Sequence, residues 1–176
     1  MQIVFVRHTS VDVPRGTCYG QTDVPLAPSF PEEAASTRDR LAAYKHFDAV
    51  YSSPLSRAVR LANFCGYDAP TLDNRLKEMN MGSWEMKKYD EIDDPNLAKW
   101  YADYMHERTT GGESFPDLYQ RVASFLDELL SSNYQRVVVF AHAGVLMAAG
   151  IYAKCFTETD CFDHQTPYGG VMEINF

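Results

Sequence analysis

An apolar strand that ends in two basic residues constrains this chain more than any other feature. Residues 2 to 6 are almost continuously apolar, and Arg7 and His8 follow them directly. Such a run is typical of a strand that is covered on both faces in a parallel sheet. A cation at the end of a buried strand needs a partner, because an unpaired buried charge is costly. The pattern therefore predicts an α/β sheet with a polar site at the ends of its strands.

Strand and helix patterns alternate along the rest of the chain. Further strands are expected at residues 49–51, 71–72, 136–141 and 171–176. Helices are expected at 29–45 and 54–65, after Ser114, and again after the strand at 136–141 up to about residue 153. Residues 29–32 have the sequence of a capping box, and Ser114 can cap the helix that follows it. This alternation predicts an α/β fold, a three-layer α/β/α sandwich with a mostly parallel central sheet.

The chain length fits one domain, 1–176, with a helical insertion at about 84–110. No apolar run approaches the roughly 20 residues of a membrane span, and the chain enters a strand directly, so a cytoplasmic protein is expected. The four cysteines lack the spacing of a zinc site. The net charge of -8 argues against nucleic acid as a partner, because a phosphate-backbone binder needs a basic face. We expect no metal and no cofactor, and a monomer or homodimer.

Three segments place polar side chains at strand ends. His8 follows the first strand, Ser52, Ser53 and Arg57 follow the second, and His142 follows the strand at 136–141. In an open α/β sheet, ligands bind outside the carboxyl ends of the strands, so these groups are expected to converge on one crevice. The helices that start after Ser53 and His142 would add backbone N–H groups aimed at an anion. The sequence therefore predicts a phosphate site.

Four motifs resemble those of a known family. They are Arg7-His8-Thr9, Ser52 to Ala58, Leu76-Lys77-Glu78 with Gly82 to Glu85, and Ala141 to Gly144. In this order they resemble the signatures of the histidine phosphatase superfamily, which has the phosphoglycerate mutase-like fold, and they span nearly the whole chain. Residues 18–26, Cys-Tyr-Gly-Gln-Thr-Asp-Val-Pro-Leu, look most like the α-ribazole phosphatase branch. That branch removes the 5′-phosphate from α-ribazole phosphate in cobalamin assembly.

The resemblance implies catalytic roles for five residues. His8 would attack phosphorus and become a phosphohistidine, which divides one difficult displacement into two. Arg7, Arg57 and His142 would hold the phosphate oxygens, where charge spreads in the transition state. Glu78 would protonate the departing oxygen and later accept a proton from water. No metal is required when cationic side chains do this work.

Some assignments are open at the level of the sequence. Glu85 lies one short loop from Glu78 and is the alternative proton donor. The loop at 9–28 is too long for a mere connection, and loops of this length are often functional. Within it, Gln21 and Thr22 either reach the phosphate or stabilise the turn.

Two positions depart from the family pattern. Thr9 and Met86 stand where the family usually has glycine. A side chain at Thr9 narrows the backbone approach to the phosphate, although its hydroxyl could bind the phosphate instead. Neither departure removes a reacting group, so only the shape of the pocket is affected.

Aromatic residues are concentrated in the insertion. They could form a substrate lid that stacks on an aromatic leaving group. They could equally be core residues, because aromatic side chains at helical spacing usually pack inward. The residues concerned are Trp84, Tyr89, Trp100, Tyr101 and Tyr104.

The preferred function is hydrolysis of a small-molecule phosphate ester, α-ribazole 5′-phosphate. A phosphoglycerate mutase would need additional cations for a bisphosphate, whereas the insertion is mainly acidic. A broad-specificity phosphatase is a further candidate, and a phosphohistidine-protein phosphatase would favour an open site without the aromatic insertion. In another class, a non-catalytic module could bind phosphate esters, but the presence of all five reacting groups argues against it.

Overall fold

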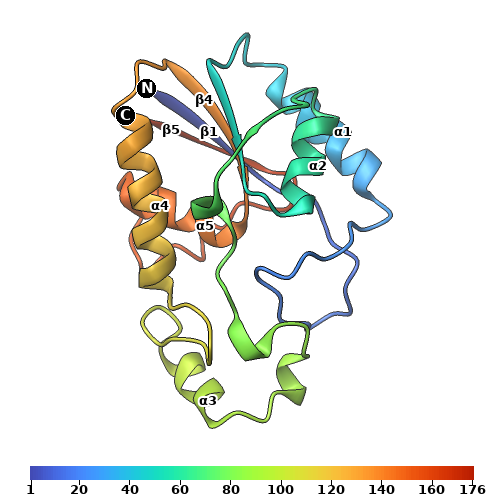
Figure 1. Ribbon diagram of the computed structural model, residues 1–176, viewed down its shortest axis with the longest axis vertical. Coiled ribbons are helices and arrows are strands. Elements are labelled where there is room, and N and C mark those ends of the chain that lie inside the picture. Colours follow the sequence, from blue (N-terminus) through green and yellow to red (C-terminus); the bar gives the residue numbers. More distant parts are fainter.

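A five-stranded sheet forms the centre of the computed structural model, which describes all residues 1–176 (Figure 1). The strands are β1 (Gln2–Arg7), β2 (Ala49–Ser52), β3 (Thr71–Leu72), β4 (Arg136–Ala141) and β5 (Val171–Asn175). Their order in the sheet is β3-β2-β4-β1-β5. The first four are parallel and β5 runs antiparallel to β1, so the predicted mostly parallel sheet is confirmed.

Helices cover both faces of this sheet. In Figure 1, α1 (Phe30–Leu41) and α2 (Ser56–Phe64) lie on one side, while α4 (Phe115–Leu130) and α5 (Ala143–Tyr152) lie on the other. Helix α3 (Pro95–Ala102) lies at one end of the molecule, in the segment at 84–110. Three short 3₁₀ turns, Asn74–Leu76, Gly82–Trp84 and Tyr89–Glu91, connect β3 to this segment and continue into it. No helix is long and apolar enough to cross a membrane.

The alternation of side chains along β1 explains the two layers. Val4 and Val6 pack with α1 and α2 in one apolar cluster, whereas Ile3 and Phe5 pack with α4 and α5 in another. All four side chains are fully buried. Because successive strand residues point to opposite faces, a strand buried on both sides must be apolar throughout. The opening sequence of the chain is therefore explained by its central place in the sheet.

The predicted start of α1 was wrong in its detail. Ser29 has helical backbone angles and makes no capping hydrogen bond, and its hydroxyl instead donates to Glu33 at 2.6 Å. The helix ends at Leu41 rather than near residue 45. Ser114 does begin α4 as expected, since its N–H and hydroxyl both donate to the Asp117 carboxylate. Local sequence predicted both caps, but only the one at Ser114 forms, because a preceding turn already holds the backbone at Ser29.

Candidate active site

His8 lies at the carboxyl end of β1 and is 3% exposed. Its Nδ1 is 2.7 Å from the carbonyl oxygen of Thr9, which can only accept a hydrogen bond, so Nδ1 carries the proton and Nε2 carries the free lone pair. Burial, followed by the positive charges of Arg57 and Arg7, lowers the pKa of the imidazole to about 3. The ring is therefore neutral at ordinary pH, which is the state that a nitrogen nucleophile requires.

Two arginines flank this histidine without pairing with a carboxylate. Arg7 donates from Nη1 to the carbonyl of Thr166 at 2.7 Å, and its guanidinium lies 4.1 Å from the ring centre of Tyr168. Arg57 is fully buried and donates to the carbonyls of Thr22 and Gly20. The ion pairs of the chain involve other arginines. A buried guanidinium that lacks a carboxylate is suited to an incoming anion.

His142 completes the group from the end of β4. Its ring centre is 5.2 Å from that of His8, and the side chain is fully buried. Its Nε2 is 2.8 Å from Ser53 Oγ, which also accepts the backbone N–H of Leu55. This arrangement favours donation from the Ser53 hydroxyl to Nε2 and leaves the proton of His142 on Nδ1. Burial lowers the pKa of His142, followed by the charge of Arg57, so this ring is also neutral.

Unsatisfied hydrogen-bonding atoms concentrate in this region. Only five buried side-chain polar atoms in the protein lack a partner, and four of them belong to residues that the sequence assigned to the phosphate. Buried polar groups are nearly always hydrogen-bonded, because each unpaired one costs about 1–3 kcal/mol. The four are Arg7 Nε, Thr9 Oγ1, Arg57 Nε and His142 Nδ1. Together they provide a set of donors suited to a bound oxyanion.

Glu78 lies where this donor set meets a large cavity. Its carboxylate accepts from the N–H groups of Met79 at 2.9 Å and Gly144 at 3.2 Å. Burial lowers the pKa of Arg57, and the negative charge of the Glu78 carboxylate opposes this lowering. A Cβ on Gly144 would clash with Glu78 Oε1, so only glycine leaves room for the carboxylate here.

Glu85 serves a different purpose from Glu78. Its two oxygens accept backbone N–H groups from Gly20, Gln21, Thr22 and Met81 at 2.9–3.1 Å. Burial opposes its ionisation, but these hydrogen bonds hold its pKa below the usual range. An ionised carboxylate with four backbone donors is a structural anchor for the long loop rather than a proton donor.

Gln21 and Thr22 make contacts that stabilise the loop. The amide of Gln21 donates to the carbonyl of Glu78 at 3.0 Å, and the carbonyl of Thr22 accepts from Arg57. The structure thus shows the turn-stabilising role for both residues. Contact of either side chain with phosphate is still a prediction.

The helix N-termini do not supply the expected free N–H groups. The N–H of Ser56, at the start of α2, donates to Asp23 at 2.9 Å. The N–H of Gly144, in the first turn of α5, donates to Glu78. That expectation was wrong for these two groups, because carboxylates of the protein itself already occupy them.

The adjoining cavity has a volume of about 560 Å³ and mostly hydrophobic walls. Four of the five aromatic residues predicted to form a lid line it, and Glu78 is the only charged residue that does. Its walls contain no lysine, arginine or histidine. The lining residues are Tyr19, Glu78, Met79, Met81, Tyr89, Trp100, Tyr101, Tyr104, Met105, Phe115, Leu118, Ala143, Gly144, Met147, Phe162 and Gln165.

Trp84 is the exception among the predicted lid residues. Its side chain is fully buried in the core cluster beside α4 and α5, and its Nε1 donates to Asp94 at 2.7 Å. It does not line the cavity but packs edge-on against Trp100, with ring centres 5.8 Å apart. Its assignment to the lid was therefore wrong, because its side chain joins the main core beside α4 and α5 and anchors the insertion there.

Two tyrosines that the sequence analysis did not assign also border the site. Tyr168 lies beside Arg7 and also beside His8, and the ring centres of Tyr168 and His8 are 5.5 Å apart. Its hydroxyl is 2.9 Å from that of Tyr19, whose ring lies 5.5 Å from the Arg57 guanidinium. No motif signals Tyr168, since it follows the second histidine motif by more than 20 residues in an irregular segment.

The departure at Met86 has a backbone explanation. Met86 adopts a φ of 64°, in the left-handed region that favours glycine. Its N–H donates to the carbonyl of Cys18, which ties the insertion to the long loop. The glycine that the family usually carries there would suit this conformation better.

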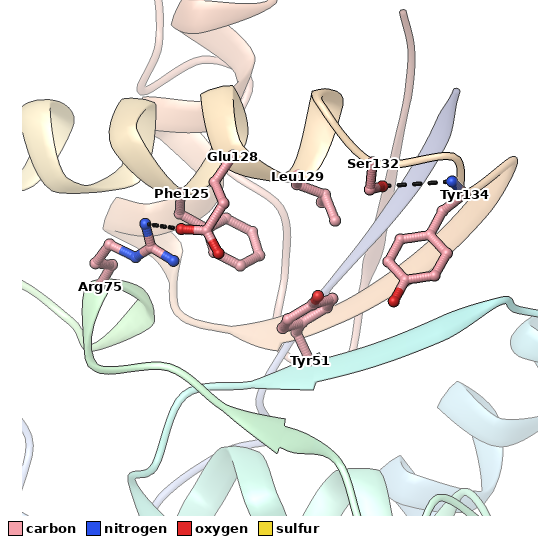
Figure 2. Close-up of a pocket in the computed structure, with 7 residues that line it drawn as sticks. All are labelled: Tyr51, Arg75, Phe125, Glu128, Leu129, Ser132 and Tyr134. Atoms are coloured by element: carbon pink, nitrogen blue, oxygen red, sulfur yellow. Dashed lines mark hydrogen bonds and ion pairs between the residues drawn. The ribbon is translucent and has the colours of Figure 1, made fainter.

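A second hollow differs from the candidate active site. It has a volume of about 210 Å³ and lies between β2 and α4 (Figure 2). Its one arginine, Arg75, is already paired with Asp73 at 2.6 Å and with Glu128 at 2.8 Å. No cluster of three or more His, Cys, Asp or Glu side chains is arranged to hold a metal ion anywhere in the protein. This hollow therefore lacks the free guanidinium that Arg7 and Arg57 provide at the strand ends.

The family model of the histidine phosphatase superfamily (branch 1) matches residues 3–176. The chain belongs to the histidine phosphatase superfamily. The predicted family and phosphoglycerate mutase-like fold are thus confirmed. Membership of this superfamily supports a phosphatase enzyme.

Similar proteins of this superfamily carry different activity names. The α-ribazole phosphatase from Shigella flexneri has a TM-score of 0.90 and 26% identity, covering 100% of this chain and 91% of that chain. Phosphoserine phosphatase 1 of Hydrogenobacter thermophilus is 28% identical over 155 residues, 81% of this chain and 71% of its own length. Phosphoglycerate mutase-like protein 4 of Arabidopsis thaliana is 31% identical over 157 residues, 82% of this chain and 67% of its own length. The substrate must therefore be inferred from the cavity of this chain.

Proposed function

We propose that this protein hydrolyses a phosphate monoester through a phosphohistidine on His8, and that its substrate is α-ribazole 5′-phosphate. The single observation that carries the reaction type is the set of four buried, unpartnered polar atoms around a neutral imidazole. A site whose buried polar groups have no partner within the protein gains most from binding an oxyanion.

In the first step, the Nε2 lone pair of His8 attacks phosphorus and the bond between phosphorus and the leaving oxygen breaks. Arg7, Arg57 and His142 stabilise the charge on the equatorial oxygens. The hydrogen bond from Nδ1 of His8 to the Thr9 carbonyl holds the ring in the reactive tautomer. Glu78 gives its proton to the leaving oxygen, which departs as an alcohol into the cavity.

In the second step, water attacks the phosphohistidine. Glu78 takes a proton from this water, the bond from phosphorus to Nε2 breaks, and orthophosphate and free His8 result. The position of Glu78 in the wall of the cavity suits both roles, because leaving alcohol and incoming water occupy the same side of the phosphoryl group.

The cavity supports an uncharged aromatic leaving group. Four insertion aromatics and several methionines line it, and flat rings and thioethers both pack well against an aromatic base. A second phosphate or a carboxylate would enter a space without any cationic side chain. This argues against a phosphoglycerate mutase and against phosphoserine as the substrate. An aromatic nucleoside monophosphate such as α-ribazole 5′-phosphate fits the wall chemistry better.

Two competing functions are separable from this one by experiment. A phosphohistidine-protein phosphatase would need an open site, whereas this one continues into a walled cavity. A non-catalytic binding module would bind phosphate esters without turnover.

We expect the cytoplasm as the compartment, in line with the role in cobalamin assembly implied by the proposed substrate.

The decisive experiment combines a turnover screen with trapping of the intermediate. The purified protein is given α-ribazole 5′-phosphate, 3-phosphoglycerate, phosphoserine, ribose 5-phosphate and a phosphohistidine peptide. We expect the highest kcat/KM for α-ribazole 5′-phosphate and an acid-labile ³²P label that His8→Ala abolishes. Binding without release of phosphate would favour the non-catalytic module, and a higher kcat/KM for phosphoserine would overturn the substrate assignment.

A further inference from the structure

Glu78 stands in a segment with no regular secondary structure. It follows the 3₁₀ turn Asn74–Leu76 and precedes the turn Gly82–Trp84, so neither a helix nor a strand fixes its backbone. General acid catalysis depends steeply on position, and a shift of about 1 Å can cost about 10²-fold in rate. Some other contact must therefore hold this segment in place.

Arg121 of α4 makes that contact. Its Nη1 donates to the carbonyls of Arg75 at 2.7 Å and Lys77 at 2.6 Å, and its Nη2 donates to the carbonyl of Glu78 at 2.9 Å. One planar guanidinium thus binds three carbonyls within a short stretch of chain. The side chain is mostly buried, 17% exposed, so water competes little for these hydrogen bonds.

Glu113 holds the opposite side of the same guanidinium. Its carboxylate accepts from Arg121 Nε and Nη2, both at 2.9 Å, in the bidentate geometry that is strongest for this pair. The same carboxylate accepts the N–H of Asn80 at 2.8 Å. The Arg121–Glu113 pair therefore hydrogen-bonds to the backbone both before and after Glu78. The side-chain amide of Gln21 is a second donor to the Glu78 carbonyl.

We propose that Arg121 is a positioning residue for Glu78, and that the Arg121–Glu113 pair sets the distance between this carboxylate and the leaving oxygen. The inference rests on the proposed function, since it assumes that Glu78 is the general acid. The side-chain hydrogen bonds of Arg121 all go to main-chain carbonyls and Glu113, so they act through the segment that holds Glu78. Its positive charge also lowers the pKa of His142, but Arg121→Lys retains that charge.

The test uses leaving-group dependence, which a loss of stability would not change. Arg121→Lys keeps the positive charge, but its single nitrogen with three N–H donors cannot reproduce the five hydrogen bonds that Arg121 makes to three carbonyls and Glu113. We expect kcat for ribose 5-phosphate to fall by about 10²-fold. The pre-steady-state rate constant for release of nitrophenolate from p-nitrophenyl phosphate should fall by less than about 10-fold, because nitrophenolate needs little protonation. KM for both esters should change little. Equal losses with the two esters, or parental kinetics, would overturn the proposal.

Arg75→Lys is the matched control. Arg75 is also a paired arginine beside α4, and it donates to Glu128 (Figure 2). It donates as well to the carbonyl of Ser124, but its side chain makes no hydrogen bond to Glu78. Its variant should keep the parental ratio of the two kcat values. A ratio shifted as far as in Arg121→Lys would show a general effect of the α4 contact and would contradict a specific role.

Two further variants keep the outcome interpretable. If Arg121→Lys does not fold, Glu113→Gln is measured instead, with the same pattern expected at about 10-fold, because one anchor of the guanidinium is weakened. Glu78→Gln must itself show the leaving-group pattern, which is a larger loss of rate with ribose 5-phosphate than with p-nitrophenyl phosphate. If Glu78→Gln shows it and neither Arg121→Lys nor Glu113→Gln does, this inference fails while the proposed function stands. If Glu78→Gln lacks it, the proposed role of Glu78 fails first.

Discussion

The phosphate end and the leaving-group end of the candidate active site are built in different ways. At the phosphate end, His8 and His142 follow β1 and β4 and Arg57 lies in the first turn of α2, and their neutral or cationic side chains are held by short hydrogen bonds. At the leaving-group end, the cavity takes four of its aromatic residues from the insertion and contains no cation. The comparison indicates that the chemistry is fixed by the fold and that specificity is added by one segment.

The largest expected effect lies at the phosphate end. His8→Ala should abolish turnover of every ester, because it removes the only nucleophile of the proposed mechanism. The change leaves a small cavity beside the strand end, so the thermal melting temperature is measured alongside activity. More than a trace of phosphatase activity in a folded variant would contradict the phosphohistidine mechanism.

Glu78→Gln tests the boundary between the two ends. A general acid contributes typically about 10²- to 10⁴-fold, so hydrolysis of alkyl phosphates should fall by that factor. With p-nitrophenyl phosphate the first step suffers less, and a burst of nitrophenol with accumulating phosphoenzyme should appear in stopped-flow and quench experiments.

Glu85→Gln is the matched control for this carboxylate. Glu85 holds four backbone N–H groups of the loop and its surroundings, so its variant should lower the melting temperature without a burst. A burst in Glu85→Gln together with parental kinetics in Glu78→Gln would reverse the two assignments.

Tyr101→Ala probes the leaving-group end alone. Tyr101 is 55% exposed and lines the cavity, so its removal should spare the fold. Loss of stacking on a base is worth about 1–3 kcal/mol, which predicts a KM for α-ribazole 5′-phosphate raised about 5- to 150-fold and an unchanged KM for ribose 5-phosphate. Tyr134→Ala, remote from the cavity, is the control. Equal changes with both esters would exclude a stacking role.

The pH dependence of stability concerns the phosphate end again. The pKa of His8 is about 3 in the folded protein and about 6.5 in an unfolded chain. Between these pH values the unfolded chain binds more protons at His8 than the folded protein does. The free energy of unfolding must therefore fall as the pH decreases below about 6.5. Thermal melts between pH 8 and pH 5 should show this decline, and a shallower one in His8→Gln. The same slope in both proteins would mean that His8 titrates normally.

The smallest expected effect is that of chelation. No side-chain cluster suits a metal, and arginines can neutralise the phosphoryl charge. Incubation with EDTA should leave kcat/KM unchanged within error. Loss of activity that Zn²⁺ or Mg²⁺ restores would show that a metal acts at the phosphate end.

The sequence predicted the phosphate end well and the leaving-group end poorly. His8 and His142 follow apolar strands, and the rule that parallel strands end at one edge was enough to bring them together. Trp84 was misplaced because its burial depends on how the insertion folds back, which no periodicity encodes. Glu85 could not be separated from Glu78 for the same reason, since its four backbone partners come largely from a distant loop.

The donors of the phosphate end that have no partner within the protein also affect turnover. They fit orthophosphate as well as they fit the phosphoryl group of a substrate, so the last product should dissociate slowly. Inorganic phosphate would then act as a competitive inhibitor, and the rate of catalysis in a cell would follow the ratio of ester to free phosphate rather than the ester concentration alone.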